Sequence, residues 1–174
     1  KIPVVAGGSM PTVVPQVIIE NPNIDYVVEG EGEVAFKELL SSLEKNKPLN
    51  KVPNLWYKEK GEVKKTGIVK YLNMDEIPDQ RLDFWDDKHF NKPYDGKLYN
   101  TGFFEASRGC MHKCHYCINR AFQVFQEESG KVRRNKSVDQ IINEVKSIHK
   151  ERNFELIMFT DDNFLARQPR EFNE

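Results

Sequence analysis

The sequence lacks any apolar stretch close to the roughly 20 residues that a membrane-spanning helix requires. It also lacks a charge bias, because 26 Lys and Arg residues and 27 Asp and Glu residues give a formal net charge of −1. No global basic field therefore argues for nucleic acid binding. The densest basic run, Lys131 to Lys136, is expected to be a solvated loop. Internal repeats and low-complexity segments are absent, and a length of 174 residues suits one globular domain or parts of two.

Cysteine is scarce, and its distribution is uneven. The three cysteines of the chain, Cys110, Cys114 and Cys117, fall within eight residues. An odd number of clustered cysteines fits a disulfide framework poorly and fits a reducing compartment, so we expect a cytoplasmic protein. No secretory signal is apparent, since one lysine is followed directly by a strand-like segment. Both ends read as cuts through folded structure, and we expect a fragment.

The first 48 residues have the pattern of an α/β fold. Residues 2–6 predict a buried strand that ends at Gly7-Gly8, and Thr12 is expected to cap a helix reaching Glu20. Residues 24–28 predict a second strand. The turn at residues 30–33 then opens a helix that ends near residue 46. Strands and helices in this order are typical of a doubly wound α/β sheet.

A different pattern follows. Residues 54–66 predict a β-hairpin around Lys60-Gly61, and residues 68–100 predict an aromatic-rich linker. A second α/β unit begins with a strand at residues 102–106 that leads into the cysteine loop. Ser137 and Gln140 form a capping box for a helix with an apolar, core-facing stripe of Val138, Ile141, Ile142, Val145 and Ile148. A strand at residues 154–160 follows, and its carboxyl end is expected at the same rim as the cysteine loop.

The cysteines have the spacing C-x3-C-x2-C, which allows three thiolates to hold one face of a metal centre. An iron–sulfur cluster with an open coordination position is one interpretation. A structural zinc site is another, with His112 or His115 as the fourth ligand. A third is a set of buried cysteines without any ligand. The spacing favours the cluster, because zinc sites usually pair two separated knuckles and this chain has one.

The segment from Ser107 to Cys117 resembles the signature of the radical S-adenosylmethionine (SAM) enzymes, with Tyr116 as the aromatic residue before the last cysteine. Met111 stands where close relatives often carry proline. The resemblance implies a [4Fe–4S] cluster on Cys110, Cys114 and Cys117, whose free iron binds SAM. It further implies reductive cleavage of SAM to a 5′-deoxyadenosyl radical, which abstracts hydrogen from an unreactive C–H bond.

The same resemblance implies a SAM-binding set. Tyr116 belongs to it, and so does the segment after the last strand, which is similar to the Asp-Asp-x-Phe variant of one large subgroup. The expected SAM contacts are Tyr116, Asp161, Asp162 and Asn163. A helix cap or a solvated turn is the alternative reading of the two aspartates. Arg133 and Arg134 are expected to make surface ion pairs.

The two glycine turns resemble the last two strands of the cobalamin-binding domain in class B radical SAM enzymes, a subgroup with methyltransferases and a magnesium-protoporphyrin cyclase. The implied cobalamin-binding residues are Gly7, Gly8, Ser9, Thr12, Gly30, Glu31, Gly32 and Glu33. The implied α/β architecture has three parts. Residues 1–48 form the C-terminal part of a Rossmann-like cobalamin-binding domain, 49–100 a linker with a β-hairpin, and 101–174 the first βα units of a partial TIM barrel, both domains being truncated.

The resemblance thus implies part of a cobalamin-dependent radical SAM enzyme that methylates or otherwise modifies an unactivated carbon of a small molecule under anaerobic conditions. A reductase, flavodoxin or ferredoxin would supply electrons. No catalytic residue beyond the cofactor ligands is expected. Two alternatives stay open: a radical SAM enzyme that does not use cobalamin, and a zinc-stapled binding module without catalysis.

Overall fold

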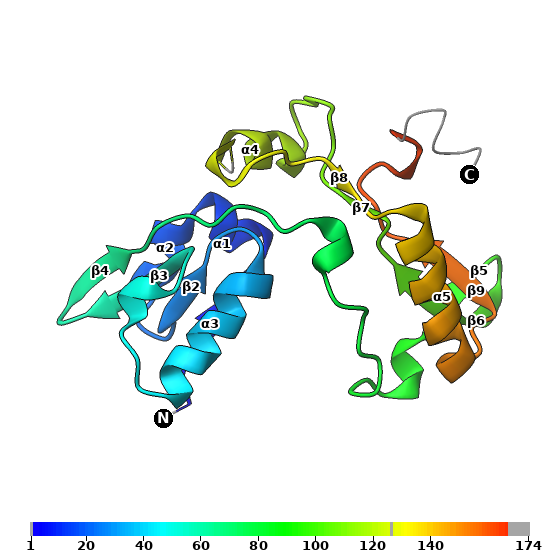
Figure 1. Cartoon of the computed structure of the whole chain (residues 1–174), viewed down its shortest axis with the longest axis horizontal. Helices are drawn as coiled ribbons and strands as arrows, with labels where there is room; N and C mark the ends of the chain where they lie inside the picture. Colours follow the sequence, from blue (N-terminus) through cyan, green and yellow to red (C-terminus); the bar gives the residue numbers. More distant parts are fainter. Residues whose placement is uncertain (1, 126, 167–174) are drawn as a thin grey trace. The chain divides into compact units, whose positions relative to one another are not determined.

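The computed structural model describes residues 2–125 and 127–166. It is a mixed α/β structure that divides into two compact units (Figure 1). The first unit comprises Lys1–Tyr71 and His112–Val132, and the second comprises Leu72–Met111 and Arg133–Glu174. Among the described residues, no helix is long and apolar enough to cross a membrane.

The first unit contains a four-stranded sheet in the order β1-β2-β3-β4. Strands β1 (Val5–Ala6) and β2 (Tyr26–Val28) are parallel, as the alternating pattern predicts, while β3 (Leu55–Glu59) and β4 (Glu62–Lys65) are antiparallel. The predicted hairpin is thus present, and it extends the sheet of the first unit through pairing of β3 with β2. Val28, Ala35, Leu39, Val52 and Leu55 are buried in the core of this unit.

The helices of the first unit are α1 (Ser9–Val13), α2 (Pro15–Glu20), α3 (Gly32–Glu44) and α4 (Ile118–Phe125), and α4 contacts α1. The expected single helix capped by Thr12 is wrong, because Thr12 lies inside α1 and the helix breaks at Val14. The cause is Pro15, which pushes the preceding residue out of the helical region: Val14 has φ −130° and ψ 53°.

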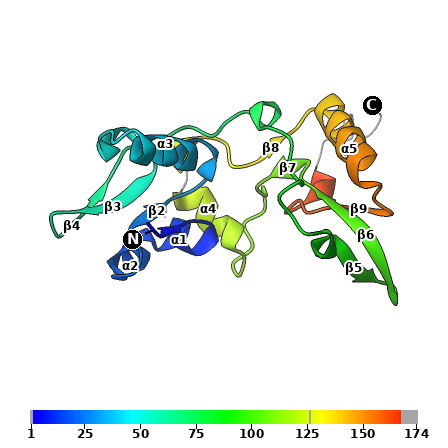
Figure 2. The ribbon, with the colours of Figure 1, turned by 90° about the horizontal axis from the view of Figure 1, so that it is seen from below.

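The second unit is built on β5 (Asn91–Tyr94), β6 (Lys97–Phe104) and β9 (Leu156–Phe159), where β6 and β9 are parallel. A separate ladder joins β7 (Ser107–Arg108) to β8 (Arg134–Asn135), and Figure 2 shows this pair side by side. Phe90, Phe104, Ile148 and Phe154 form the core. Short 3-10 turns lie at Leu49–Lys51, Met74–Glu76, Asp87–His89, Glu127–Ser129 and Phe164–Ala166.

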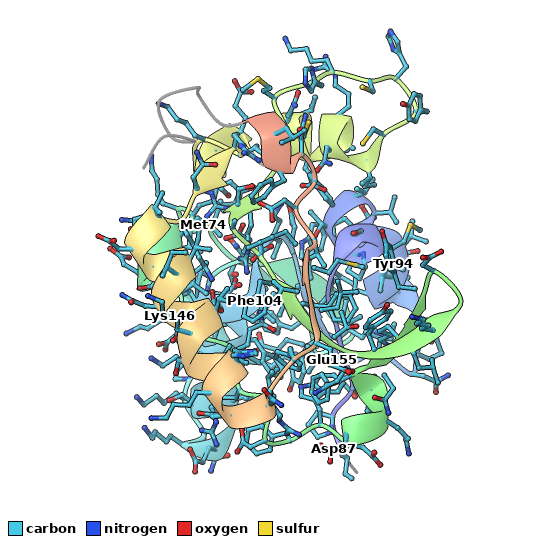
Figure 3. All side chains as sticks on the ribbon, turned by 90° about the vertical axis from the view of Figure 1, so that its right-hand side faces the viewer. Met74, Asp87, Tyr94, Phe104, Lys146 and Glu155 are labelled. Carbon is cyan, nitrogen blue, oxygen red and sulfur yellow. The ribbon has the colours of Figure 1, made fainter. Side chains whose placement is uncertain are left out.

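Helix α5 (Val138–Arg152) begins where the capping pattern predicts. The Ser137 hydroxyl accepts a hydrogen bond from Gln140 N, and Asn153 ends the helix in the left-handed conformation at φ 49°. The predicted apolar stripe is only partly correct, because Ile148 is buried while Ile142 is 44% exposed. In Figure 3, Phe104 is labelled on the side of α5 that faces the strands, and Lys146 on the outer side of the helix.

A buried ion pair in the second unit was not predicted. Lys136 Nζ lies 2.5 Å from Glu144 Oε2, and both side chains are at least 95% buried, with exposures of 4% and 2%. The expectation of a solvated loop at Lys131 to Lys136 is therefore wrong at Lys136. The sequence shows that residues 136 and 144 carry opposite charges. It does not show that both are buried, because their burial results from the packing of α5 against the segment before it.

Candidate metal and cofactor site

The cysteine loop leaves the second unit directly after β7. Gly109 follows this strand with φ +74°, a conformation that favours glycine, and Cys110 comes next. The loop then enters the first unit, to which Cys114 and Cys117 belong. No disulfide joins the three cysteines within the described residues, Cys114 is exposed, and Cys110 and Cys117 are half-buried. Three soft thiol donors without a disulfide fit an iron–sulfur cluster.

The second half of the loop continues into helix α4. Cys117 N donates to the Cys114 carbonyl at 3.2 Å, and Arg120 N donates to the Cys117 carbonyl at 3.1 Å. The turn around the last two cysteines is therefore hydrogen-bonded into the start of the helix. Tyr116 is 94% exposed, so its side chain is accessible to a ligand. Among the described residues, no three Cys, His, Asp or Glu side chains lie together as ligands of one metal ion.

Asp161 is tied to the strand that leads into the cysteine loop. One carboxylate oxygen accepts a hydrogen bond from the Ser107 hydroxyl, and the other accepts one from Ala106 N at 3.1 Å. Both oxygens thus already have protein partners. Asp162 is exposed and Asn163 is partly buried beside it. The predicted SAM contacts of all three residues stay predictions, but Asp161 also has a structural role that the sequence did not indicate.

Arg133 belongs to the same polar cluster. Its Nη1 donates to Ser107 Oγ at 2.7 Å and to the Gly109 carbonyl at 3.1 Å. Arg134 lies in β8, and its Nη1 donates to the Leu72 carbonyl at 2.9 Å. For Arg133 the expectation of a surface ion pair is wrong, because its guanidinium group binds a hydroxyl and a carbonyl oxygen. For Arg134 the expectation stays a prediction beside the hydrogen bond to Leu72. No sequence pattern distinguishes such an arginine from a solvated one.

The two glycine turns of the first unit meet at Thr12. Its hydroxyl donates to the Gly8 carbonyl at 2.8 Å and accepts from Gly30 N at 2.9 Å. Gly8 and Gly30 have φ +95° and +77°, which explains glycine at both positions. Because β1 and β2 are adjacent parallel strands, the turns at their carboxyl ends lie side by side. The structure thus brings the predicted Gly7-Gly8 and Gly30 turns together.

An open groove of about 1270 Å³ runs along these turns and the exposed face of α3. Its wall combines backbone at the turns with apolar side chains, and includes Gly7, Gly8, Gly30, Gly32, Glu33, Phe36 and Leu40. Phe36 and Leu40 are 45% and 50% exposed. Of the predicted residues, Ser9, Thr12 and Glu31 do not line the groove, although Thr12 supports two turns that do.

Sequence reasoning missed Glu29, the buried residue before Gly30. Its carboxylate accepts a hydrogen bond from Trp56 Nε1 at 2.7 Å and lies 3.1 Å from Lys65 Nζ. Lys65 also lies over the Trp56 ring, 5.0 Å from its centroid. The hairpin therefore stabilises the second glycine turn through contacts to Glu29, the residue before Gly30. The sequence offered one signal for this contact, a tryptophan at position 56 in a predicted hairpin strand.

The radical SAM superfamily model matches residues 104–173, a segment that contains β7, the cysteine loop, α5 and β9. This part of the chain is therefore similar to the radical SAM superfamily. Similarity to particular proteins extends over nearly the whole chain.

Two curated proteins are similar over nearly the whole chain. An uncharacterized methyltransferase of Pyrococcus horikoshii is 35% identical over 169 residues, which cover 96% of this chain and 35% of that protein. The anaerobic magnesium-protoporphyrin IX monomethyl ester cyclase of Synechocystis is 26% identical over 164 residues, covering 92% of this chain and 30% of that protein. The chain thus spans about a third of the length of these relatives.

Solved structures show the same fold. The radical SAM methyltransferase TsrM from Kitasatospora setae, solved with tryptophan substrate and a SAM analogue, has a TM-score of 0.67 at 17% identity and covers 98% of this chain and 32% of that chain. The cobalamin-dependent radical SAM enzyme OxsB, solved with aqua-cobalamin, has a TM-score of 0.65 at 25% identity and covers 95% of this chain and 22% of that chain. The α/β class and the resemblance to cobalamin-dependent radical SAM enzymes are confirmed.

Proposed function

We propose that this chain is part of a cobalamin-dependent radical SAM enzyme, and that Cys110, Cys114 and Cys117 ligate a [4Fe–4S] cluster. The observation that carries the proposal is the C-x3-C-x2-C loop at the carboxyl end of the β6–β7 segment, inside the region that matches the superfamily. Three thiolates leave one iron of the cluster without a protein ligand. When bound, the cluster supplies the electron for reductive cleavage of SAM.

The chain's own residues would bind and orient SAM at the carboxyl ends of β6 and β9. Tyr116 and Asp162 have exposed side chains, and the side chain of Asn163 is partly exposed. Asp161 would act chiefly by holding Ala106 and Ser107 in place, because its oxygens are already bonded there. Parallel α/β folds bind ligands at this edge of the sheet, which supports the assignment.

Cobalamin would bind along the glycine turns of the first unit. The groove beside Gly7, Gly8, Gly30 and Gly32 is open and largely apolar, and glycine allows close approach of the backbone to a large planar ligand. Thr12 would keep the two turns at a fixed separation. The domain division at residues 1–48, 49–100 and 101–174 stays part of this proposal, with the hairpin supporting the cobalamin side through Glu29.

Methylation of a small molecule at an unactivated carbon is the reaction we propose. The names of the relatives support it, since an uncharacterized methyltransferase and TsrM are among them. A reductase, flavodoxin or ferredoxin would deliver electrons, and cysteines without a disulfide fit the reducing cytoplasm. A radical SAM enzyme without cobalamin is the second candidate, because two glycine turns beside an open groove are also found in α/β domains that bind no corrin.

Anaerobic reconstitution of the full-length protein tests the cluster. We expect iron and sulfide in about fourfold excess over protein, a cluster absorbance, and 5′-deoxyadenosine from SAM after reduction. Changing any one of the three cysteines to alanine should abolish 5′-deoxyadenosine formation. Stoichiometric zinc without sulfide in the wild-type protein would end the proposal in favour of a zinc-stapled module.

His112→Gln and His115→Gln are matched controls in the same loop. Both side chains are exposed. If the cluster has only thiolate ligands, these variants keep their iron and sulfide. Loss of the metal in either histidine variant would favour a closed zinc site with a histidine ligand.

Cobalamin binding needs a separate measurement. The full-length protein, mixed anaerobically with cobalamin and desalted, should retain the corrin absorbance. A protein that forms 5′-deoxyadenosine but retains no corrin would support the second candidate. Gly8→Val is expected to reduce retention, since φ +95° is unfavourable for a β-branched residue.

A further inference from the structure

Arg133 occupies an unusual position beside the first cluster ligand. Within the second unit, one nitrogen of its guanidinium binds both the Gly109 carbonyl and the Ser107 hydroxyl. Gly109 is the residue directly before Cys110, and Ser107 in turn donates to Asp161 at the end of β9. A single side chain thus joins the start of the cysteine loop to the edge of the parallel sheet.

The charge of Arg133 is not neutralised by direct contact. Its hydrogen-bond acceptors are a hydroxyl and a carbonyl, and among the described residues no carboxylate forms an ion pair with it. Its Nε and Nη2 are buried and have no hydrogen-bond partner within the described structure. An unsatisfied buried donor is destabilising, so such a group is informative about function.

A cation with only neutral partners suits a loop that becomes negatively charged. Three cysteines must lose their protons to ligate iron, and the cluster gains a further negative charge when it is reduced. The nearest carboxylate in this network, Asp161, reaches Arg133 only through the Ser107 hydroxyl, so within the described part of the chain the guanidinium group is left without a direct anionic partner until the loop is loaded. Arg134, the neighbouring cation, binds the Leu72 carbonyl on another segment.

We infer that Arg133 is a positioning residue for the cysteine loop. It holds the Gly109 carbonyl, and thereby the backbone at Cys110, against the Ser107–Asp161 contact, and its charge favours the reduced cluster. The inference rests on the proposed function and deepens it. It has two separable parts, an anchoring part that exists without the cluster and an electrostatic part that requires it.

Hydrogen exchange of the cluster-free, full-length protein tests the anchoring part. Arg133→Met removes the charge and the donors at similar length, and we expect exchange in residues 106–111 to become about tenfold faster, since charged hydrogen bonds are lost. Peptides from α5 should exchange as in the wild type, which shows that the unit is still folded. Arg133→Lys should be intermediate, because one ammonium does not reproduce the fork of the guanidinium. If residues 106–111 exchange at the same rate in Arg133→Met and in the wild type, the anchoring part of the inference is overturned.

The midpoint potential of the reconstituted cluster, followed by electron paramagnetic resonance, tests the electrostatic part. Loss of a nearby cation should shift the potential of Arg133→Met to more negative values, and Arg133→Lys should restore it because the charge is retained. An unchanged potential in the Met variant reduces Arg133 to a structural contact and overturns this part. If the wild-type protein assembles no cluster, the proposed function fails and the electrostatic part falls with it, while hydrogen exchange still decides the anchoring.

Discussion

Replacing Glu144 by glutamine removes the negative partner of Lys136 while keeping the side-chain volume. The two charged atoms are 2.5 Å apart and both side chains are almost completely buried. At an effective dielectric constant of about 20, Coulomb attraction at that distance is about 7 kcal/mol. The desolvation of two ions costs several kcal/mol each, so the pair contributes little net stability. Its removal is a different matter, because one uncompensated charge stays buried.

Breaking a buried pair on one side costs about 3–5 kcal/mol, a large share of the 5–15 kcal/mol by which domains are typically stable. With a urea dependence of about 2 kcal/mol per molar, a loss of 4 kcal/mol lowers the unfolding midpoint by about 2 M. We expect this shift for Glu144→Gln in urea titrations followed by circular dichroism. Lys136 N also binds the Ala106 carbonyl at 2.9 Å, so the segment before the cysteine loop should loosen as well.

Two further variants make this prediction decisive. The double variant Lys136→Met with Glu144→Leu should lie within about 2 kcal/mol of the wild type, since an apolar pair of similar volume needs no desolvation. Lys146→Met on the exposed side of the same helix is the matched control and should change stability by less than about 0.5 kcal/mol. A loss below 1 kcal/mol for Glu144→Gln would refute the reasoning, since it would mean that water reaches the pair.

Three other outcomes follow from single contacts. Thr12→Val should weaken cobalamin retention in the desalting assay, whereas Thr12→Ser should preserve it, because only serine keeps the bonds to Gly8 and Gly30. Gly102→Ala should destabilise the second unit by about 1–3 kcal/mol in the same urea titration, since the added Cβ would lie 2.4 Å from the Phe154 ring. Burial raises the pKa of Tyr26, and the Asp25 carboxylate adds to this. The folded state therefore favours the neutral phenol, and stability should fall as pH rises above about 10, less so in Tyr26→Phe. Equal alkaline slopes for the two proteins would contradict this assignment.

Local patterns predicted the elements well where the physical cause is itself local. Helix α5 begins after Ser137 because a serine hydroxyl caps the first turn, and β9 follows as a short apolar run. Thr12 shows the limit of such reasoning. A threonine before a helical pattern predicts a cap, but Pro15 breaks the helix, and the hydroxyl instead bonds to Gly8 and to Gly30, which lies 18 residues further along the sequence.

The candidate site also combines features that local sequence patterns predict with contacts between distant segments. The cysteine spacing predicted the donor set, because the sequence by itself shows three thiols on one short loop. The partners of Arg133 and Asp161 could not be read in that way. Ser107 and Asp161 are separated by 54 residues, and they meet because β6 and β9 pair in parallel.

The sequence alone therefore predicted the proposed ligands and determined the glycine turns and the alternation of strands and helices, since each depends on neighbours within one turn or one strand. The tertiary structure decided which charges are buried and which carbonyls the arginines hold. It also decided that the hairpin supports the sheet of the first unit. These features depend on the exclusion of water and on contacts between distant segments, and residue order does not express either one until the chain has packed.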